Sequence, residues 1–252
     1  QAAAHAYGIV VIPGAEVTRT PETIGHYNAL FTKDNNTIYA TDPFVSIQNA
    51  KAQGALVMHN HPGWRREDMK ILEFEQKVYD AGLIDGIEIM NGGEFYPHAV
   101  ERALQYGFFM SGNTDIHQST YEVYGMNGEF RDFTMIFAKD NSLESLREAL
   151  EARRTLAYAF GTIAGEEQLL KDFFRASVSA RVVYENAKGA KTVALTNNTS
   201  LPFLIQFPDS NPIILRPFST YRTSIGNQKA LTFTVDNMWC GKDAHPQIEF
   251  VF

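Results

Sequence analysis

Carboxylate and imidazole side chains recur at one kind of position in this sequence, directly after a short apolar run. Glu16, His61, Asp115 and His117 all follow such runs, which predict buried strands, and each run is followed in turn by a helical segment. Because the carboxyl ends of parallel strands meet at one edge of a sheet or barrel, we expect these side chains to lie close together. The set offers oxygen and nitrogen ligands and no thiolate, which favours zinc, manganese or iron over a structural cysteine–zinc site.

The segment 55–64, ALVMHNHPGW, is the clearest example. Pro62 cannot continue a central strand and Gly63 frees the turn, so His61 is expected at or just past the end of a strand. In an ideal strand His59 faces the same side as His61, where it is expected to line a wall of the substrate site.

Each of these residues also has an ordinary structural interpretation. Glu16 could be a surface carboxylate after a turn, and His26, which follows Gly25, could belong to a turn. Asp115 could cap the loop that follows it, and His117 could donate to a backbone carbonyl. Their shared position beside strand ends is the observation that favours a site.

The elements that must position these side chains alternate between strand and helix as far as about residue 176. Strands are expected at 9–16, 25–31, 55–61, 86–90, 108–112 and 133–138, and helices at 42–53, 67–81, 97–106, 142–153 and 169–174. Short strands at sandwich spacing follow, at 178–184, 192–196, 203–207, 213–215, 220–225, 231–235 and 248–252. We therefore predict two domains, 1–176 and 177–252.

Composition limits the classes of partner. The chain has 252 residues and a net charge of −7 at pH 7, so neither nucleic acid nor an anionic membrane is expected as its main partner. A cluster of metal ions would still allow a phosphorylated substrate to bind. No apolar run approaches the roughly 20 residues of a membrane span, and the single Cys240 leaves no disulfide framework within the chain.

Five short motifs occur in a recognisable order: GAEVTR at 14–19, GHYNA at 25–29, NHPGW at 60–64, GIE at 86–88 and TDIH at 114–117. In this order and context the sequence resembles the polymerase and histidinol phosphatase (PHP) family. It is most similar to the two-domain bacterial branch described as predicted metal-dependent phosphoesterases. The resemblance covers residues 1 to about 176 well and the β domain loosely.

The resemblance implies a distorted (β/α)7 barrel followed by a small all-β, sandwich-like domain. It also implies a cluster of up to three divalent ions, Zn, Mn or Fe, at the strand ends. Glu16 would bridge the ions and share one with His26 and His61, Asp115 would complete a second ion and His117 would bind a third. Asp115 and His117 are thereby the implied catalytic residues, and a metal-bridging hydroxide would attack a small phosphorylated substrate.

Arg19 follows the bridging glutamate and is placed either to contact a phosphate with its guanidinium fork or to lie on the surface. The family also begins with a strand ending in His-x-His and a second strand ending in His, and neither precedes Gly8 in this chain. A barrel without its first strands would expose sheet edges, so we expect the sequence to begin inside the natural protein. If it begins at Gln1, only the ion held by Glu16, His26 and His61 has its protein ligands.

Two other functions remain open besides a metal-dependent phosphoesterase. Barrel metal clusters also serve metallohydrolases that act on C–N bonds, and fold alone does not fix function. The third possibility is a non-catalytic metal-binding barrel whose β domain binds a partner or a glycan. The sequence gives no indication of oligomeric state or cellular location.

Overall fold

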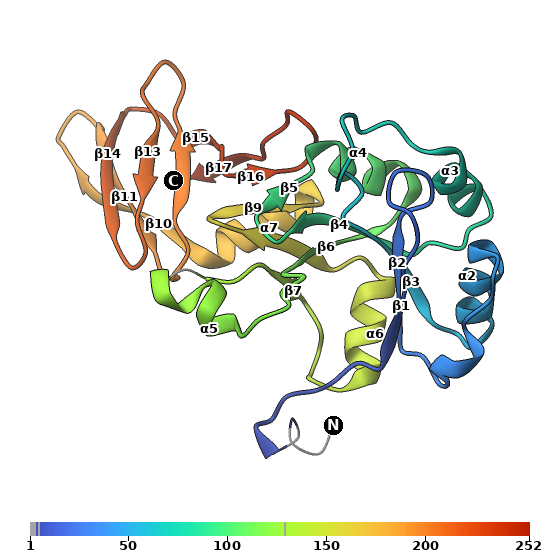
Figure 1. The fold of residues 1–252 in the computed structure, drawn as a ribbon. Helices are drawn as coiled ribbons and strands as arrows, with labels where there is room; N and C mark the ends of the chain where they lie inside the picture. Colours follow the sequence, from blue (N-terminus) through green and yellow to red (C-terminus); the bar gives the residue numbers. More distant parts are fainter. Residues whose placement is uncertain (1–3, 5, 129) are drawn as a thin grey trace. The chain divides into compact units, whose positions relative to one another are not determined.

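The structure is a computed structural model that describes residues 4, 6–128 and 130–252 (Figure 1). The chain divides into two compact units, Gln1–Phe160 and Gly161–Phe252. The sequence predicts a boundary between two separately folding domains, 1–176 and 177–252. That boundary stays a prediction.

The first unit is built on a mixed sheet. Its strands are β1 (Gly14–Val17), β2 (His26–Leu30), β3 (Leu56–Asn60), β4 (Gly86–Asn91), β5 (Glu94–Phe95) and β6 (Phe109–Asn113). The order is β1-β2-β3-β4-β5, with β6 also paired to β4. Strands β3, β4 and β6 are parallel, whereas β1, β2 and β3 are antiparallel to one another in turn. A separate antiparallel pair in this unit joins β7 (Phe133–Ile136) and β8 (Thr155–Ala159).

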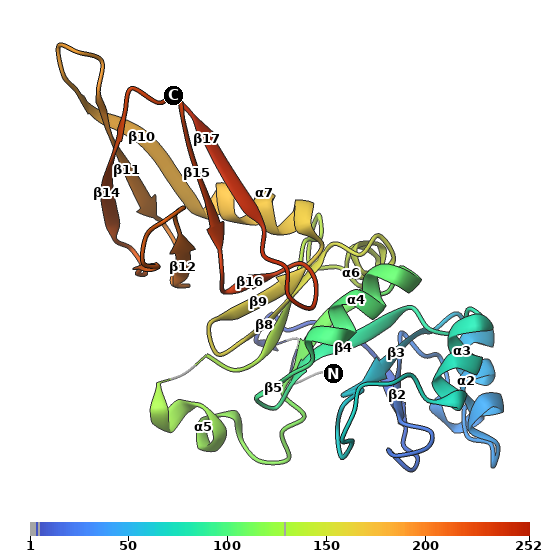
Figure 2. The same ribbon diagram turned by 90° about the horizontal axis from the view of Figure 1, so that it is seen from above.

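Helices cover this sheet and shield its central strands. The helices of this unit are α2 (Pro43–Ala52), α3 (Glu73–Asp80), α4 (Pro97–Tyr106) and α6 (Leu143–Glu151). The short helix α5 (Thr120–Val123), which is exposed, and the 3-10 turns η1 (Asn35–Thr37) and η2 (Gly125–Asn127) lie in its loops. Helix α2 packs over β1 to β3, and α4 over β4 and β6 (Figure 2). Asp42 caps α2 by accepting from Phe44 N at 2.8 Å. Gly107 ends α4 at φ 73°, a left-handed backbone that glycine adopts without strain.

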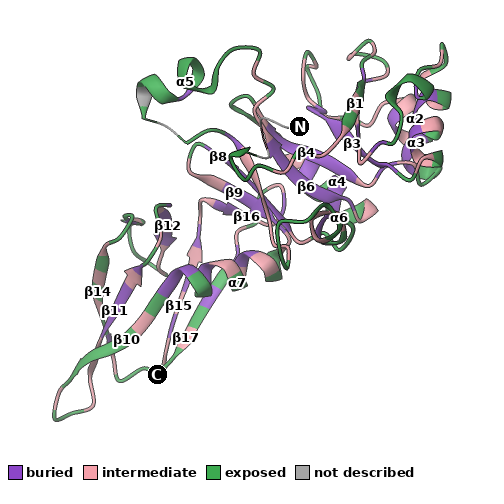
Figure 3. Ribbon diagram, turned by 90° about the horizontal axis from the view of Figure 1, so that it is seen from below, coloured by how far each residue is buried: buried purple, intermediate pink, exposed green. Residues whose placement is uncertain are grey.

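The centre of the sheet is closely packed. Strands β3, β4 and β6 are buried along nearly their whole length (Figure 3). Where β4 meets β6, a Cβ on Gly86 would lie 2.3 Å from the ring of Phe109, so a larger residue there would have to displace that ring. Phe109 also joins Leu56, Met58 and Leu150 in a buried hydrophobic cluster.

The structure corrects three expectations about these elements. The strand expected at 9–16 begins only at Gly14, because Pro13 cannot donate to a ladder. The helix expected at 67–81 begins only at Glu73. The sheet is not wholly parallel: only residues 18–25 join β1 to β2, and a parallel crossover needs about a dozen residues or more.

The fold class is therefore mixed α/β. Across the described residues the sheet paths are open, and the (β/α)7 barrel stays a prediction. Within the same described ranges, no helix combines the length and the apolar character that crossing a bilayer requires.

The second unit is mostly β, and the strands expected after residue 177 are all present. Its elements are β9 (Thr162–Gly165), α7 (Glu167–Ser177), β10 (Val178–Glu185), β11 (Lys191–Asn197), β12 (Phe203–Gln206), β13 (Ile213–Leu215), β14 (Thr220–Gly226), β15 (Ala230–Val235), β16 (Met238–Trp239) and β17 (Gln247–Val251). Two antiparallel sheets, β10-β11-β14 and β13-β12-β15-β17, supply its framework, and β9 pairs with β16. Phe174 of α7 packs edge-on against Phe203 and Phe233, at ring-centroid distances of 4.9 and 5.7 Å.

Candidate metal centre

Three of the predicted ligands meet at one edge of the first unit's sheet. One candidate ligand atom from each of Glu16, His26 and His61 lies within 4.8 Å of the other two. The antiparallel ladder brings them together, because the end of β1 and the start of β2 share an edge, with Val17 paired to Tyr27. His26 in turn pairs with Asn60 at the end of β3, so His61 is the next residue along.

The hydrogen bond of His26 fixes which ring nitrogen is available to a ligand. Its Nε2 lies 2.8 Å from the carbonyl oxygen of Arg19, and a carbonyl can only accept, so Nε2 carries a proton. Its Nδ1 lies 3.0 Å from Oε1 of Glu16. In the neutral ring Nδ1 is an acceptor, and the carboxylate oxygen opposite it is also an acceptor. A proton or a cation must therefore be shared by these two atoms. A histidine that donates one ring N–H to a carbonyl and offers the other nitrogen has the arrangement of a metal ligand.

His61 completes the group because its backbone leaves the strand conformation. Its φ is 27°, and its backbone N donates to Oε2 of Glu88. Burial, and the neighbouring ring of His26, lower the pKa of His61 below its ordinary value, which keeps the imidazole neutral and able to bind an ion. Trp64 packs beside both rings, with centroid distances of 5.5 Å to His26 and 5.2 Å to His61.

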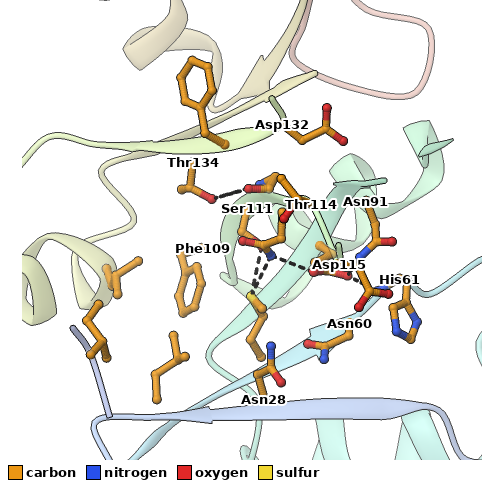
Figure 4. Close-up of a pocket in the computed structure, with 18 of the residues that line it drawn as sticks. Asn28, Asn60, His61, Asn91, Phe109, Ser111, Thr114, Asp115, Asp132 and Thr134 are labelled. Carbon is orange, nitrogen blue, oxygen red and sulfur yellow. Dashed lines mark hydrogen bonds between the residues drawn. The ribbon is translucent and has the colours of Figure 1, made fainter. Parts of the chain in front are cut away.

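The remaining two predicted ligands take different places. Asp115 is exposed, lines the same cavity as Glu16 and His61, and lies beside His61 in Figure 4. Its charge opposes the lowering of the His61 pKa. His117 is also exposed, and it is absent from the described residues that line the cavity. The structure thus joins Glu16, His26 and His61, places Asp115 next to them, and leaves His117 outside.

Glu88 is a buried carboxylate of this site to which the sequence analysis gave no role. It is 2% exposed and accepts from the His61 backbone, from Asn113 Nδ2 at 2.7 Å and from Asn91 Nδ2 at 3.1 Å. Burial raises its pKa to about 7, although these donors act in the opposite direction. The signal was present in the sequence, since Glu88 interrupts the apolar run of β4 between Ile87 and Ile89.

A cavity of about 450 Å³ is lined in part by Glu16, His61, Glu88 and Asp115. Its lining includes the polar residues Asn28, Asn60, Asn91, Asn113, Ser111, Thr114 and Thr134 and the apolar residues Leu30, Met58, Phe109, Ile136 and Leu150. Figure 4 shows several of them around the cavity. Two of its lining residues carry buried oxygens that lack a hydrogen-bond partner among the described residues, Asn60 Oδ1 and Asp132 Oδ1. Such an atom costs roughly 1–3 kcal/mol unless it is satisfied, so both oxygens favour a ligand that brings donors or positive charge.

Neither residue expected to contact substrate points into this cavity. Arg19 donates to the carbonyls of Thr18 and Ala40, at 2.7 and 2.9 Å. His59 is 1% exposed and its Nδ1 lies 2.6 Å from the hydroxyl of Tyr79. Its chain neighbours on β3 line the cavity, so strand alternation turns His59 to the opposite face. His61 returns to the cavity side only because its positive φ breaks that alternation.

Comparison with known proteins gives an informative structural similarity. No family model matches the sequence, and no curated protein matches it. A solved structure from Bacteroides vulgatus ATCC 8482, a two-domain protein containing a predicted PHP-like metal-dependent phosphoesterase, superposes with a TM-score of 0.92. The two sequences are 32% identical, and the match covers 100% of this chain and 77% of that one. The similarity therefore extends to the sequence as well as to the fold.

Proposed function

Because this chain belongs to the family of two-domain proteins with a PHP-like phosphoesterase domain, we propose that it is a metal-dependent phosphoesterase with Glu16, His26 and His61 at its metal centre. The resemblance that the five motifs carry is confirmed at the level of the family. The observation that supports this proposal most strongly is the arrangement of His26, whose Nε2 donates to a carbonyl while Nδ1 faces Glu16 at 3.0 Å.

The donor set fits a divalent ion. One carboxylate and two imidazoles suit zinc, manganese or iron, and His61 is kept neutral. A bound divalent ion would polarise a phosphoryl oxygen and make hydroxide available near neutral pH. Asp115, beside His61 on the same cavity wall, would add a ligand for a further ion. A cluster of up to three ions, with His117 on the third, remains part of the proposal.

The other cavity residues are proposed to hold the substrate and the ligands in place. Glu88 fixes the backbone of His61 and orients Asn113, which turns a carboxamide toward the cavity. Arg131 also lines the cavity, and its planar fork matches the oxygens of a phosphate. We therefore assign phosphate contact to Arg131 in place of Arg19, whose guanidinium donates to two backbone carbonyls.

The test is release of inorganic phosphate from a panel of phosphomonoesters and phosphodiesters, with Mn²⁺ or Zn²⁺ added. We expect hydrolysis of at least one class, with loss on Glu16→Gln or Asp115→Ala. Glu151→Gln is the matched control, because that exposed carboxylate lies on α6 and pairs with Arg147 of the same helix. A metal-loaded protein that cleaves none of these esters would contradict the proposal. Hydrolysis of amides instead would favour a metallohydrolase that acts on C–N bonds. If the protein hydrolyses neither esters nor amides, a non-catalytic binding role is favoured.

A further inference from the structure

A buried charged network lies behind the metal centre, on the face of β3 away from the cavity. It joins His59 on β3, Arg66 in the following loop, Glu75 and Tyr79 on α3, and Arg102 on α4. His59, Glu75 and Arg102 are 1%, 0% and 4% exposed. The proposed reaction uses none of these groups, yet burying them is costly unless they are paired.

The loop that the network holds is the one that carries His61 and Trp64. This loop, 61–72, has two non-glycine residues with left-handed backbones, His61 at φ 27° and Arg65 at φ 56°. Residues keep such angles only where surrounding contacts hold them there. The conformation that turns His61 toward Glu16 and His26 therefore depends on surrounding contacts, of which the hydrogen bond from His61 N to Glu88 is one.

Arg66 adds further contacts by spanning the loop that follows His61. Its Nη1 donates to Pro62 O at 2.7 Å and to Glu75 Oε1 at 2.5 Å, and its Nη2 donates to Lys70 O. One guanidinium thus ties the residue next to His61 to the far end of the loop. A lysine, with a single ammonium group, cannot reproduce this two-sided arrangement.

Glu75 holds that guanidinium in place. Its Oε2 accepts from Leu72 N at 2.9 Å and lies 3.6 Å from Arg102 Nη1. Its Oε1 also lies 3.4 Å from His59 Nε2. The carboxylate therefore joins the helix start, the loop and β3 at one buried point.

We propose that Arg66 and Glu75 are positioning residues that set His61 and Trp64 in the geometry of the metal centre. This inference rests on the proposed function for the presence of a metal ion. The part that concerns the conformation of the loop does not depend on that function. If the network only stabilised the fold, weakening it would lower the unfolding temperature while folded protein kept its metal affinity. If it positions the ligand, folded protein loses metal affinity.

The first experiment measures Mn²⁺ affinity by calorimetry in Arg66→Lys and Glu75→Gln, with circular dichroism to establish folding. We expect binding about 10- to 100-fold weaker, the usual effect of losing a group that orients a ligand. The matched controls are Arg154→Lys and Glu148→Gln, an exposed arginine–glutamate pair with Nη1 to Oε1 at 2.9 Å, and their affinity should equal that of wild type. If Glu75→Gln does not fold, Arg66→Lys, which keeps the charge, tests the same contact.

The second experiment needs no metal. The chain has two tryptophans, so in a Trp239→Phe background acrylamide quenching reports Trp64 alone. Arg66→Lys should raise the quenching constant of metal-free protein. Wild-type Mn²⁺ affinity and unchanged quenching in folded Arg66→Lys would overturn the inference. A wild type that binds no Mn²⁺ would instead refute the metal centre, and quenching alone would then decide whether Arg66 positions the loop.

Discussion

Replacing Glu88 by glutamine should remove a specific part of the pH dependence of stability in the metal-free protein. Burial raises the pKa of Glu88 from its ordinary 4.5 to about 7. The folded state therefore holds a proton on this carboxyl between these pH values while the unfolded state has released it. By linkage, the free energy of unfolding falls as the pH rises through that window.

The size of the effect follows from the same rise in pKa. At about 1.4 kcal/mol per pH unit, Glu88 accounts for roughly 3 kcal/mol of stability that is present below pH 4.5 and lost above pH 7. Glu88→Gln has no proton to lose at this position. The difference in unfolding free energy between the variant and wild type should therefore change by roughly 3 kcal/mol, in favour of the variant, as the pH rises.

The assay is urea unfolding of both proteins in a metal chelator, at several pH values between 4 and 8. Other titrating groups, such as His59 and His61, are present in both proteins and cancel in the comparison. A difference that stays constant across this range would show that Glu88 is not held protonated by burial, and the reasoning would fail.

Three further results are expected. Glu16→Gln should weaken Mn²⁺ binding at least about 10-fold in calorimetry because it removes a ligand, and equal affinity would count against the site. Asn197→Ala should lower the free energy of unfolding in urea by about 2–4 kcal/mol. The buried Asn197 Nδ2 donates to Leu201 O at 2.7 Å, and its Oδ1 accepts from Thr199 N at 2.9 Å. A loss below about 1 kcal/mol would contradict this expectation. Gly86→Ala should cost about 1–3 kcal/mol through overlap with Phe109, and Phe109→Leu should recover part of that loss.

Much of the fold could be predicted from the sequence, because strand and helix periodicity is local information. The strands of the second unit and the caps of α2 and α6 lie where turn residues and N-cap residues predict them. The direction of β1 could not be predicted from its apolar run. A run of this kind indicates burial, and strand direction depends on the connection to the next strand.

In the candidate site, too, some features could be predicted from the sequence and others could not. Glu16, His26 and His61 could be found because residue type and motif order identify them. That His59 and His61 lie on opposite faces depends on the positive φ of His61, which no spacing rule contains. The roles of Glu88 and Asp132 could not be predicted, because a buried carboxylate acquires its role only from the donors that the fold brings to it.

The most direct test of the metal centre is a crystal structure of the protein soaked with Zn²⁺, with anomalous scattering measured at the zinc edge. We expect a peak about 2.0–2.2 Å from a Glu16 carboxylate oxygen, from Nδ1 of His26 and from a ring nitrogen of His61, while Nε2 of His26 still donates to the Arg19 carbonyl. An anomalous map without a peak at these residues, or one in which His26 binds through Nε2, would contradict the account.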